Sequence, residues 1–227
     1  MAFNISYNNP LSKTLIVCCK VRLNSYEEYT KIKLNHIYLS EARPHMFLFE
    51  GIHSKRVAKT LVQLADRIKK EIKQQKFTDV YVIGLSYSGF GAIYLSHLLN
   101  CTCYSFSPPT NITEPFLKDE YYIGGDLRQD IWKNRKQIYD CAIKHNYYLD
   151  LSKIQFTNHV YIVYGSLNKN DTKNALLMGN KENIVLIPIE TKEHICIFYG
   201  LIREKTLHLL FNGMNSSNPI FPFIREN

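Results

Sequence analysis

The sequence of 227 residues lacks any apolar run of the roughly 20 residues that a membrane-spanning helix requires. Its first segment, Met1 to Lys13, has neither the charged region nor the apolar region of a secretory signal. The six cysteines form no C-x-x-C pair, and most lie inside apolar runs, as buried reduced thiols do. These absences favour a soluble protein of the reducing cytoplasm.

Cofactor signatures are missing as well. The sequence contains no cluster of metal ligands, no P-loop and no G-x-G-x-x-G fingerprint. We therefore expect no metal site, no tightly bound cofactor, and neither nucleotide-dependent nor NAD-dependent chemistry. No run of consecutive basic residues resembles a nucleic-acid-binding tail, so we expect no nucleic-acid partner.

Positive charge is in excess, because 28 lysines and arginines stand against 20 acidic residues. The resulting net charge of +8 suits an anionic partner, such as an acidic substrate or polymer. The alternative is that frequent Lys, Asn and Ile simply reflect an AT-rich coding background. Hydrophobic residues make up 45% and charged residues 21%, which is typical of a globular chain. The length favours a single domain over residues 1–227.

Short runs of β-forming residues recur along the chain. The core of the first run, Leu15–Cys19, is continuously apolar, and later cores such as Val80–Ile83 are similar. Strands buried on both faces have this pattern, which is typical of a parallel sheet covered by helices. The six predicted strands are Thr14–Val21, His45–Gly51, Asp79–Ser86, Cys101–Ser107, His159–Ser166 and Asn183–Glu190.

Helical patterns with a period of 3.6 residues lie between and after these strands. Alternating strands and helices predict an α/β fold with a mostly parallel, doubly wound sheet of about six strands. One connection, residues 108–158, is far longer than the usual loop of about 2–6 residues, and we predict that it forms a helical cap. The predicted helices are Ser54–Gln75, Ser88–Leu99, Gln129–His145 and His194–Phe211.

The sharpest local signal is Val82–Gly91, where a buried strand runs into a turn of small residues and then a helix. Gly84, Ser86 and Ser88 follow the G-x-S-x-G pattern of a nucleophile elbow, with serine in place of the second glycine. Small neighbours let strand and helix approach each other around the strained serine. This pattern indicates that Ser86 is a nucleophile. The alternative is that Ser86 only caps the helix, a role that Ser88 could also fill.

A nucleophile elbow requires an acid after a later strand and a histidine after the last strand, in that order. Asp171 is the only aspartate in the loop after the fifth predicted strand, and His194 follows the sixth. None of the other histidines falls in a loop that follows a late strand. For the acid, Asn168 occupies the nearer position where many hydrolases carry theirs, and Glu190 and Glu193 are the alternatives. We therefore predict a Ser-His-Asp triad.

In this mechanism His194 is the general base for Ser86, and Asp171 orients the imidazole. The backbone N–H of Tyr87 would stabilise the oxyanion, together with an N–H from the loop Lys20–Asn24. That loop lacks the His-Gly or Gly-Gly pattern common in lipases, so the sequence leaves the second donor open.

With these segments, the chain resembles a minimal α/β-hydrolase that begins at the third strand of the usual sheet. It more narrowly resembles the hydrolase-like proteins of bacterial polysaccharide and capsule gene clusters, over roughly residues 14–211. Ser88 and the loop after the first strand depart from the family pattern. The segments that match, besides the elbow, are Ser105-Phe106-Ser107-Pro108, Tyr164-Gly165, Asp171, Ala175 and His194.

The resemblance implies an esterase or an O-acetyltransferase that acts on sugar hydroxyls. We expect transfer of an acetyl group from acetyl-CoA, as co-substrate, to a hydroxyl of a capsular polysaccharide. The alternatives are a carboxylesterase or deacetylase, in which water accepts the acyl group, and a non-catalytic binding module that kept the fold. The oligomeric state stays open.

The predicted cap offers residues for substrate binding. On the helix Gln129–His145, Trp132 lies on one stripe, and Arg128 and Arg135 lie on a neighbouring one. An aromatic platform flanked by cations suits a sugar ring that bears phosphate or carboxylate. The alternative is that Trp132 anchors the insertion to the core while both arginines are merely solvated.

Overall fold

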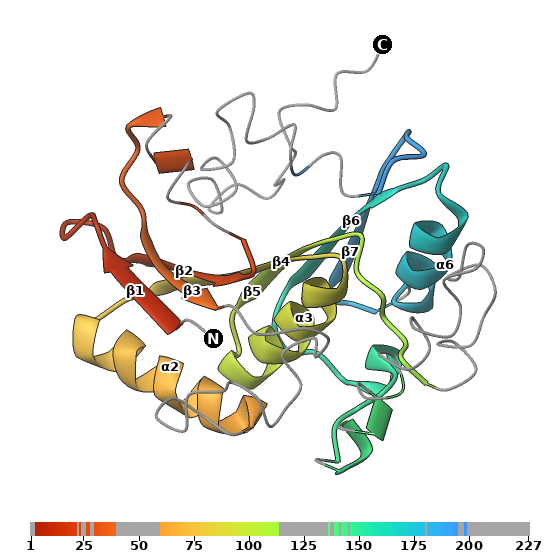
Figure 1. The fold of residues 1–227 in the computed structure, drawn as a ribbon, viewed down its shortest axis with the longest axis horizontal. Coiled ribbons are helices and arrows are strands. Elements are labelled where there is room, and N and C mark those ends of the chain that lie inside the picture. Colours follow the sequence, from red (N-terminus) through yellow and green to blue (C-terminus); the bar gives the residue numbers. More distant parts are fainter. Residues whose placement is uncertain are drawn as a thin grey trace.

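The structure, a computed structural model, shows a sheet with helices packed against it (Figure 1). It describes residues 3–39, 60–113, 136–194 and 198, except for positions 22, 24, 25, 28, 29, 137, 138, 141, 145 and 180.

Seven strands form the sheet in this part of the chain, in the spatial order β1-β3-β2-β4-β5-β6-β7. All neighbouring strands are parallel except β1 and β3, which are antiparallel. From β2 the chain first adds β3 on one side and then returns to add β4 on the other. Ligands of open α/β sheets bind at the carboxyl ends of strands that flank such a reversal. The strands are β1 (Phe3–Tyr7), β2 (Thr14–Cys19), β3 (Asn35–Leu39), β4 (Asp79–Leu85), β5 (Thr102–Phe106), β6 (Val160–Gly165) and β7 (Ile184–Ile189).

Five of the six predicted strands are confirmed, and two strands were missed. β1 is an edge strand before Thr14, so the sheet begins one strand earlier than expected, and the described residues contribute seven strands to it. β3 lies beside β2. The predicted strand His45–Gly51 is outside the described residues.

Both missed strands lack a continuous apolar core. β1 has no fully buried side chain, and β3 begins with buried polar residues, Asn35 and His36. The Asn35 amide is satisfied by the turn that joins β1 and β2: its Oδ1 accepts a hydrogen bond from Asn9 N (2.9 Å) and its Nδ2 donates to Asn9 O (2.8 Å). Burial of Asn35 is therefore a consequence of tertiary structure that a hydropathy pattern does not reveal.

Three α-helices are described with both ends. They are α2 (Leu61–Gln75), α3 (Tyr87–Leu99) and α6 (Lys169–Leu177), and a short 3-10 turn, η3 (Leu151–Lys153), lies between α3 and α6. Thr60 caps α2, because its hydroxyl accepts a hydrogen bond from Gln63 N (3.2 Å). α3 is apolar around most of its surface and buried along most of its length, since it packs against β4 and β5. α6 was not predicted as a helix.

The other two predicted helices lie largely outside the described residues. Of Gln129–His145, the described positions 136, 139, 140 and 142–144 are helical, and of His194–Phe211 only His194 and Phe198 are described, with Phe198 helical. Among the helices that the structure describes, none has the length and apolar character needed to cross a membrane.

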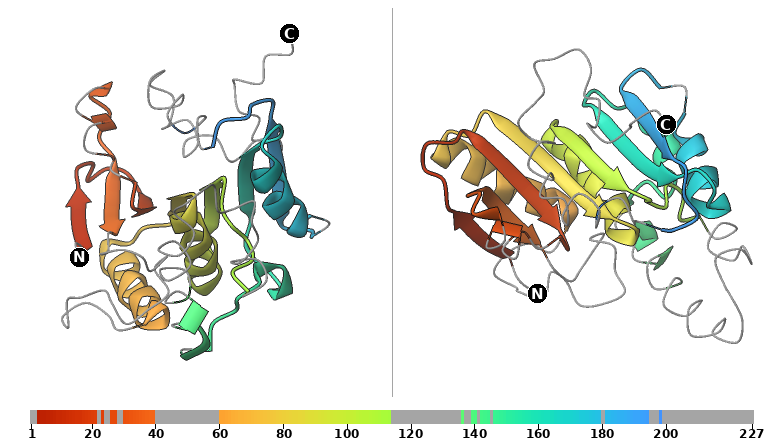
Figure 2. Two further views of the ribbon diagram at one scale, coloured as in Figure 1. Left: turned by 45° about the vertical axis from the view of Figure 1, so that its right-hand side comes forward. Right: turned by 90° about the horizontal axis from the view of Figure 1, so that it is seen from above.

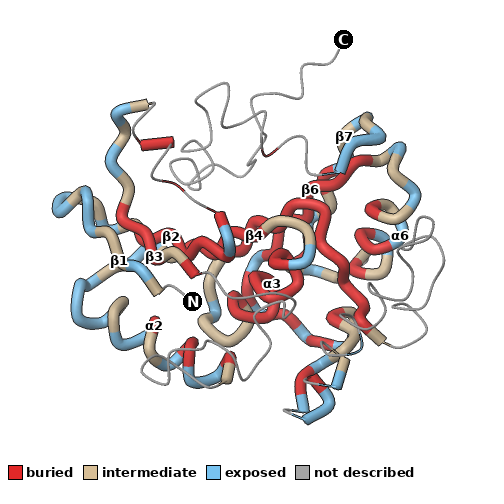
Figure 3. Tube along the Cα trace, in the orientation of Figure 1, coloured by how far each residue is buried: buried red, intermediate tan, exposed pale blue. Residues whose placement is uncertain are grey.

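Both faces of the sheet are buried. Side chains such as Val82 join one core cluster with α2 and α3, which lie side by side on that face (Figures 1 and 2). Side chains such as Ile83 join a second cluster on the opposite face, where Tyr26 and Phe198 pack. Figure 3 shows that burial is concentrated in the central strands and α3. This arrangement places the ends of β4 and α3 on a rigid frame.

The described cysteines, Cys18, Cys19, Cys101 and Cys103, are reduced thiols. Burial raises the pKa of the Cys18 and Cys103 thiols well above the ordinary value. These thiols therefore stay protonated and pack as small apolar side chains.

The described part of the 108–158 insertion packs on the face of the sheet that α2 and α3 cover. The Tyr147 hydroxyl accepts a hydrogen bond from Leu61 N (2.8 Å), and its ring contacts Tyr94 of α3 with a centroid distance of 5.6 Å. Ala142, Leu151 and Ile154 belong to the same core cluster as α2 and α3. Whether the rest of the insertion covers the site stays a prediction, because residues 114–135 lie outside the description.

The crossing of β4 and α3 depends on Gly84. A Cβ atom at this position would lie 2.6 Å from the Ser88 carbonyl oxygen and 2.6 Å from the Ala92 Cβ. We expect Gly84→Ala to force the helix away from the strand and to lower the free energy of unfolding by about 1–3 kcal/mol, measured by urea denaturation. Gly179→Ala is the control, since its Cβ would meet only Leu176 O at 3.2 Å and the Leu186 side chain. Equal losses in the two variants would contradict the expectation.

Candidate active site

Ser86 sits at the junction of β4 and α3 in a strained conformation. Its backbone angles are φ 48° and ψ −129°, a region that residues with a Cβ rarely occupy. The turn is held by two backbone hydrogen bonds, from Ser86 N to Phe106 O (2.8 Å) and from Gly89 N to Ser86 O (2.8 Å). Ser86 stands at the N-cap position of α3, but its side chain makes no capping hydrogen bond, which argues against a role in capping alone.

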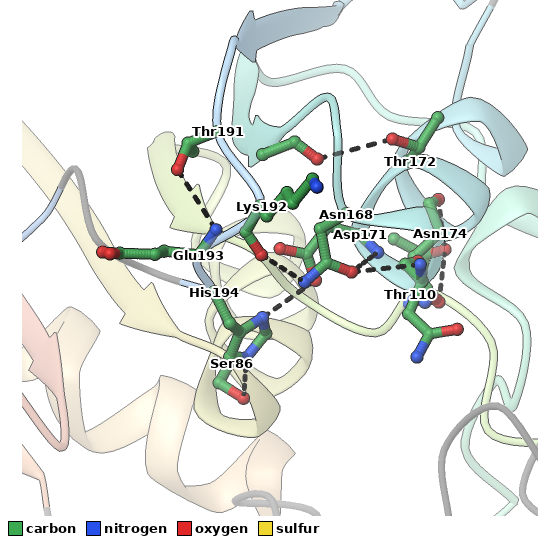
Figure 4. A network of polar contacts seen from close by, with 12 residues as sticks. Ser86, Thr110, Asn168, Asp171, Thr172, Asn174, Thr191, Lys192, Glu193 and His194 are labelled. Atoms are coloured by element: carbon green, nitrogen blue, oxygen red, sulfur yellow. Dashed lines mark hydrogen bonds and ion pairs between the residues drawn. The ribbon is translucent and has the colours of Figure 1, made fainter.

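His194 joins Ser86 and Asp171 in one chain of contacts (Figure 4). Its Nε2 lies 2.8 Å from Ser86 Oγ, and its Nδ1 lies 2.8 Å from Asp171 Oδ1. With the proton on Nδ1, the imidazole donates to the carboxylate and accepts the hydroxyl proton of Ser86 through Nε2. The arrangement can therefore move a proton from the serine to the imidazole.

The three contacting side chains differ in burial. The Asp171 side chain is 5% exposed, whereas the His194 side chain is 43% exposed. The carboxylate thus lies against protein, and the imidazole faces the solvent beside Ser86. Asp171 belongs to the first turn of α6, where the helix N-terminus favours negative charge.

Neither Asn168, at the position where many hydrolases carry their acid, nor the alternative acids Glu190 and Glu193 contact the imidazole in place of Asp171. Asn168 accepts hydrogen bonds from Asn170 N (3.1 Å) and Asp171 N (3.2 Å), and it is the N-cap of α6. In Figure 4 the Glu193 side chain extends away from His194. Glu190 is exposed in the turn after β7. Asp171 is the carboxylate that contacts the imidazole.

The turns after β6 and β7 are joined by their backbones. Ser166 N donates to Ile189 O (2.8 Å), and Leu167 N donates to Thr191 O (3.1 Å). Gly165 allows this approach, because a Cβ there would lie 2.8 Å from the Thr191 carbonyl oxygen. The acid and the histidine are therefore delivered by two adjacent turns at the carboxyl edge of the sheet.

The loop after β2 approaches the elbow from the other side. Lys20 has a positive φ of 60°, a conformation that favours glycine, and its N–H donates to Leu39 O (2.8 Å). Because this amide is engaged, Lys20 is not the second oxyanion donor. Val21 and Leu23 are the remaining described residues of Lys20–Asn24. Tyr87, whose N–H we expect to be the first donor, begins α3.

Ser88 connects this loop to the elbow. Its Oγ lies 3.0 Å from Cys19 O and 2.7 Å from Leu85 O, and it accepts a hydrogen bond from Leu85 N (3.2 Å). Cys19 ends β2, directly before Lys20. The serine that replaces the second glycine of the motif therefore bonds to both sides of the site. The sequence pattern identified the departure but not this contact.

The three predicted substrate-binding residues of the insertion, Arg128, Trp132 and Arg135, lie outside the described residues. The structure therefore brings together the three predicted triad residues, and the role of the insertion stays a prediction.

Ser88→Ala tests the connection between the loop and the elbow. Removal of the hydroxyl takes a partner from the Cys19 and Leu85 backbone groups, so we expect the free energy of unfolding to fall by about 1–3 kcal/mol. Ser152→Ala, a half-buried serine on η3, is the control. Urea denaturation measures both. A Ser88→Ala protein as stable as its parent would show that these hydrogen bonds contribute nothing.

No known family profile matches the chain, and no curated protein matches its sequence. Its structure resembles solved structures at low identity. It is similar to a protein of unknown function from Staphylococcus aureus, with a TM-score of 0.59 and 13% identity over 90% of each chain. A hydrolase from Pseudomonas aeruginosa has a TM-score of 0.55 and 9% identity over 93% of each chain.

A third similar structure is α/β hydrolase domain-containing protein 10 from mouse, with a TM-score of 0.50 and 11% identity over 89% of this chain and 93% of that one. At these identities the likeness concerns the fold alone. Together with the strand order and the strand-to-helix turn at Ser86, it shows that the chain has the α/β-hydrolase fold.

Proposed function

We propose that the protein is a serine acyl-transfer enzyme with Ser86, His194 and Asp171 as its catalytic triad. The observation that carries the proposal is the continuous contact from Ser86 Oγ through the imidazole to the Asp171 carboxylate, with 2.8 Å at each step. The strained elbow supports it, because such strain persists where a function requires it. A non-catalytic binding module would need neither feature.

In the proposed mechanism, the Ser86 Oγ attacks the carbonyl carbon of an acyl donor while His194 Nε2 takes the hydroxyl proton. The imidazolium is stabilised by Asp171, and the oxyanion by backbone N–H groups that include Tyr87. Collapse of the intermediate expels the donor's leaving group, which receives the proton from His194. The acceptor hydroxyl, which loses its proton to His194, then attacks the acyl group on Ser86. The acyl group passes to the acceptor, and Ser86 Oγ recovers its proton from His194.

For the acceptor, we propose a hydroxyl of a bacterial, capsule-type polysaccharide, with acetyl-CoA as the acetyl donor. The segments that resemble capsule-cluster proteins support this choice, and the net charge of +8 suits an anionic donor and an anionic polymer. The second candidate is ester hydrolysis. The 43% exposure of the His194 side chain favours it, because water can approach the base from solvent.

A fluorophosphonate probe tests the nucleophile. We expect it to label Ser86 in the parent protein, and we expect His194→Ala to slow labelling by at least about 1000-fold, since the serine needs its base. Labelling is followed by intact mass and by peptide mapping. Ser152→Ala should be labelled at the parental rate. Attachment to Ser88 or Ser107 instead of Ser86 would refute the assignment.

Release of CoA from acetyl-CoA distinguishes the two acceptors. If the protein is a transferase, CoA release depends on an added polysaccharide, and acetyl groups appear on the polymer in equal amount. If water is the acceptor, release is independent of polysaccharide and yields acetate. Ser86→Ala is the control for non-enzymatic release. No release under either condition, with hydrolysis of p-nitrophenyl acetate intact, would exclude acetyl-CoA as the donor.

A further inference from the structure

Asn168 contacts both of the segments that carry the acid and the base. Its Oδ1 accepts hydrogen bonds from Asn170 N (3.1 Å) and Asp171 N (3.2 Å), at the start of α6. Its Nδ2 donates to the carbonyl oxygen of Lys192 (3.2 Å), two residues before His194. The Asn168 amide oxygen thus bonds to α6, which carries Asp171, and its amide nitrogen bonds to the turn that carries His194 (Figure 4).

Apart from the His194–Asp171 contact itself, this hydrogen bond reaches the position closest to His194 along the chain among the described connections between the two turns. The backbone bonds of Ser166 and Leu167 reach Ile189 and Thr191, so they anchor the beginning of the histidine turn. The Asn168 amide reaches Lys192, further along the same turn. It therefore restrains the distance between α6 and the backbone that leads into His194.

The amide side chain of Asn168 provides an acceptor and a donor about one atom apart, and it uses both. An ionised aspartate accepts hydrogen bonds but cannot donate one to the Lys192 carbonyl oxygen. Serine caps a helix equally well, but its side chain is shorter than that of asparagine by one carbon atom. The residue at the position where many hydrolases carry their acid is here neutral, and the acid stands three positions later, on the helix that this residue caps.

We propose that Asn168 is a positioning residue, which holds the Asp171 carboxylate in hydrogen-bonding register with His194 by tying α6 to the Lys192 carbonyl. The proposal rests on the proposed function of the triad. It assigns Asn168 no contact with substrate; the residue acts through the geometry of the acid and the base.

Asn168→Ser separates positioning from helix capping. Serine keeps the capping oxygen and adds no charge, but its shorter side chain does not reach the Lys192 carbonyl oxygen while it caps α6. We expect an unchanged midpoint of thermal unfolding, an unchanged KM for p-nitrophenyl acetate, and a kcat lower by about 10- to 100-fold, since small displacements of catalytic groups are costly. Asn168→Ala, which removes both contacts, should lower kcat similarly and the unfolding midpoint as well.

Asn183→Ser is the matched control. The Asn183 Nδ2 donates to Phe156 O (2.9 Å) before β7, so this variant loses an amide-to-carbonyl bond of the same kind at the opposite end of the strand. Its kcat should equal that of the parent. If Asn168→Ser has parental kcat, or if Asn183→Ser loses as much, the proposal is wrong.

A spectroscopic arm keeps this test separate from the proposed function. A proton shared between His194 Nδ1 and the Asp171 carboxylate gives a low-field NMR signal, which His194→Ala assigns in the full chain. We expect Asn168→Ser to weaken or abolish this signal through faster exchange with solvent, and Asn183→Ser to leave it unchanged. A parental signal in Asn168→Ser overturns the positioning role. A protein that shows the signal but neither probe labelling nor esterase activity refutes the proposed function instead.

Discussion

The turn at Ser86 is the constraint on which the site depends. A residue with a Cβ does not adopt a φ of 48° and a ψ of −129° without cost, so the surroundings must enforce it. Buried β4 leads into the turn, buried α3 leads out of it, and Gly84 lets the two elements cross. The rigid centre of the sheet therefore carries the strain, and the serine hydroxyl is presented at the carboxyl edge.

The partners of the serine come from segments that follow two later strands. Asp171 lies in the first turn of α6, after β6, and His194 lies in the turn after β7; β6 and β7 are the last two of the described strands. Parallel pairing brings the carboxyl ends of β4, β6 and β7 to one edge of the sheet, which is why three residues distant in sequence meet there. The position of one turn relative to the other then depends on the backbone hydrogen bonds where the turns leave β6 and β7, and on the Asn168 side chain.

Much of this arrangement was predictable because the signals are local. Continuous apolar runs identified β2, β4, β5, β6 and β7, and the small residues around Ser86 identified the strand-to-helix turn. β1 and β3 were missed because an edge strand need not be apolar, and because the buried Asn35 is compensated by distant backbone groups. α6 was missed because its nine residues carry few apolar side chains, although Asn168 before Asp171 is an N-cap signal.

The amino-acid sequence by itself determined five strands (β2, β4, β5, β6 and β7) with their chain order, the elbow at Ser86, and the candidate acid and base in their chain order. These features depend on neighbours a few residues apart. Only the tertiary structure decided which carboxylate contacts His194, that Ser88 bonds to Cys19, and that Asn168 joins two turns. The contacting pairs are 23 to 108 positions apart, and hydrogen bonds over such separations exist only once the sheet has brought its strand ends together.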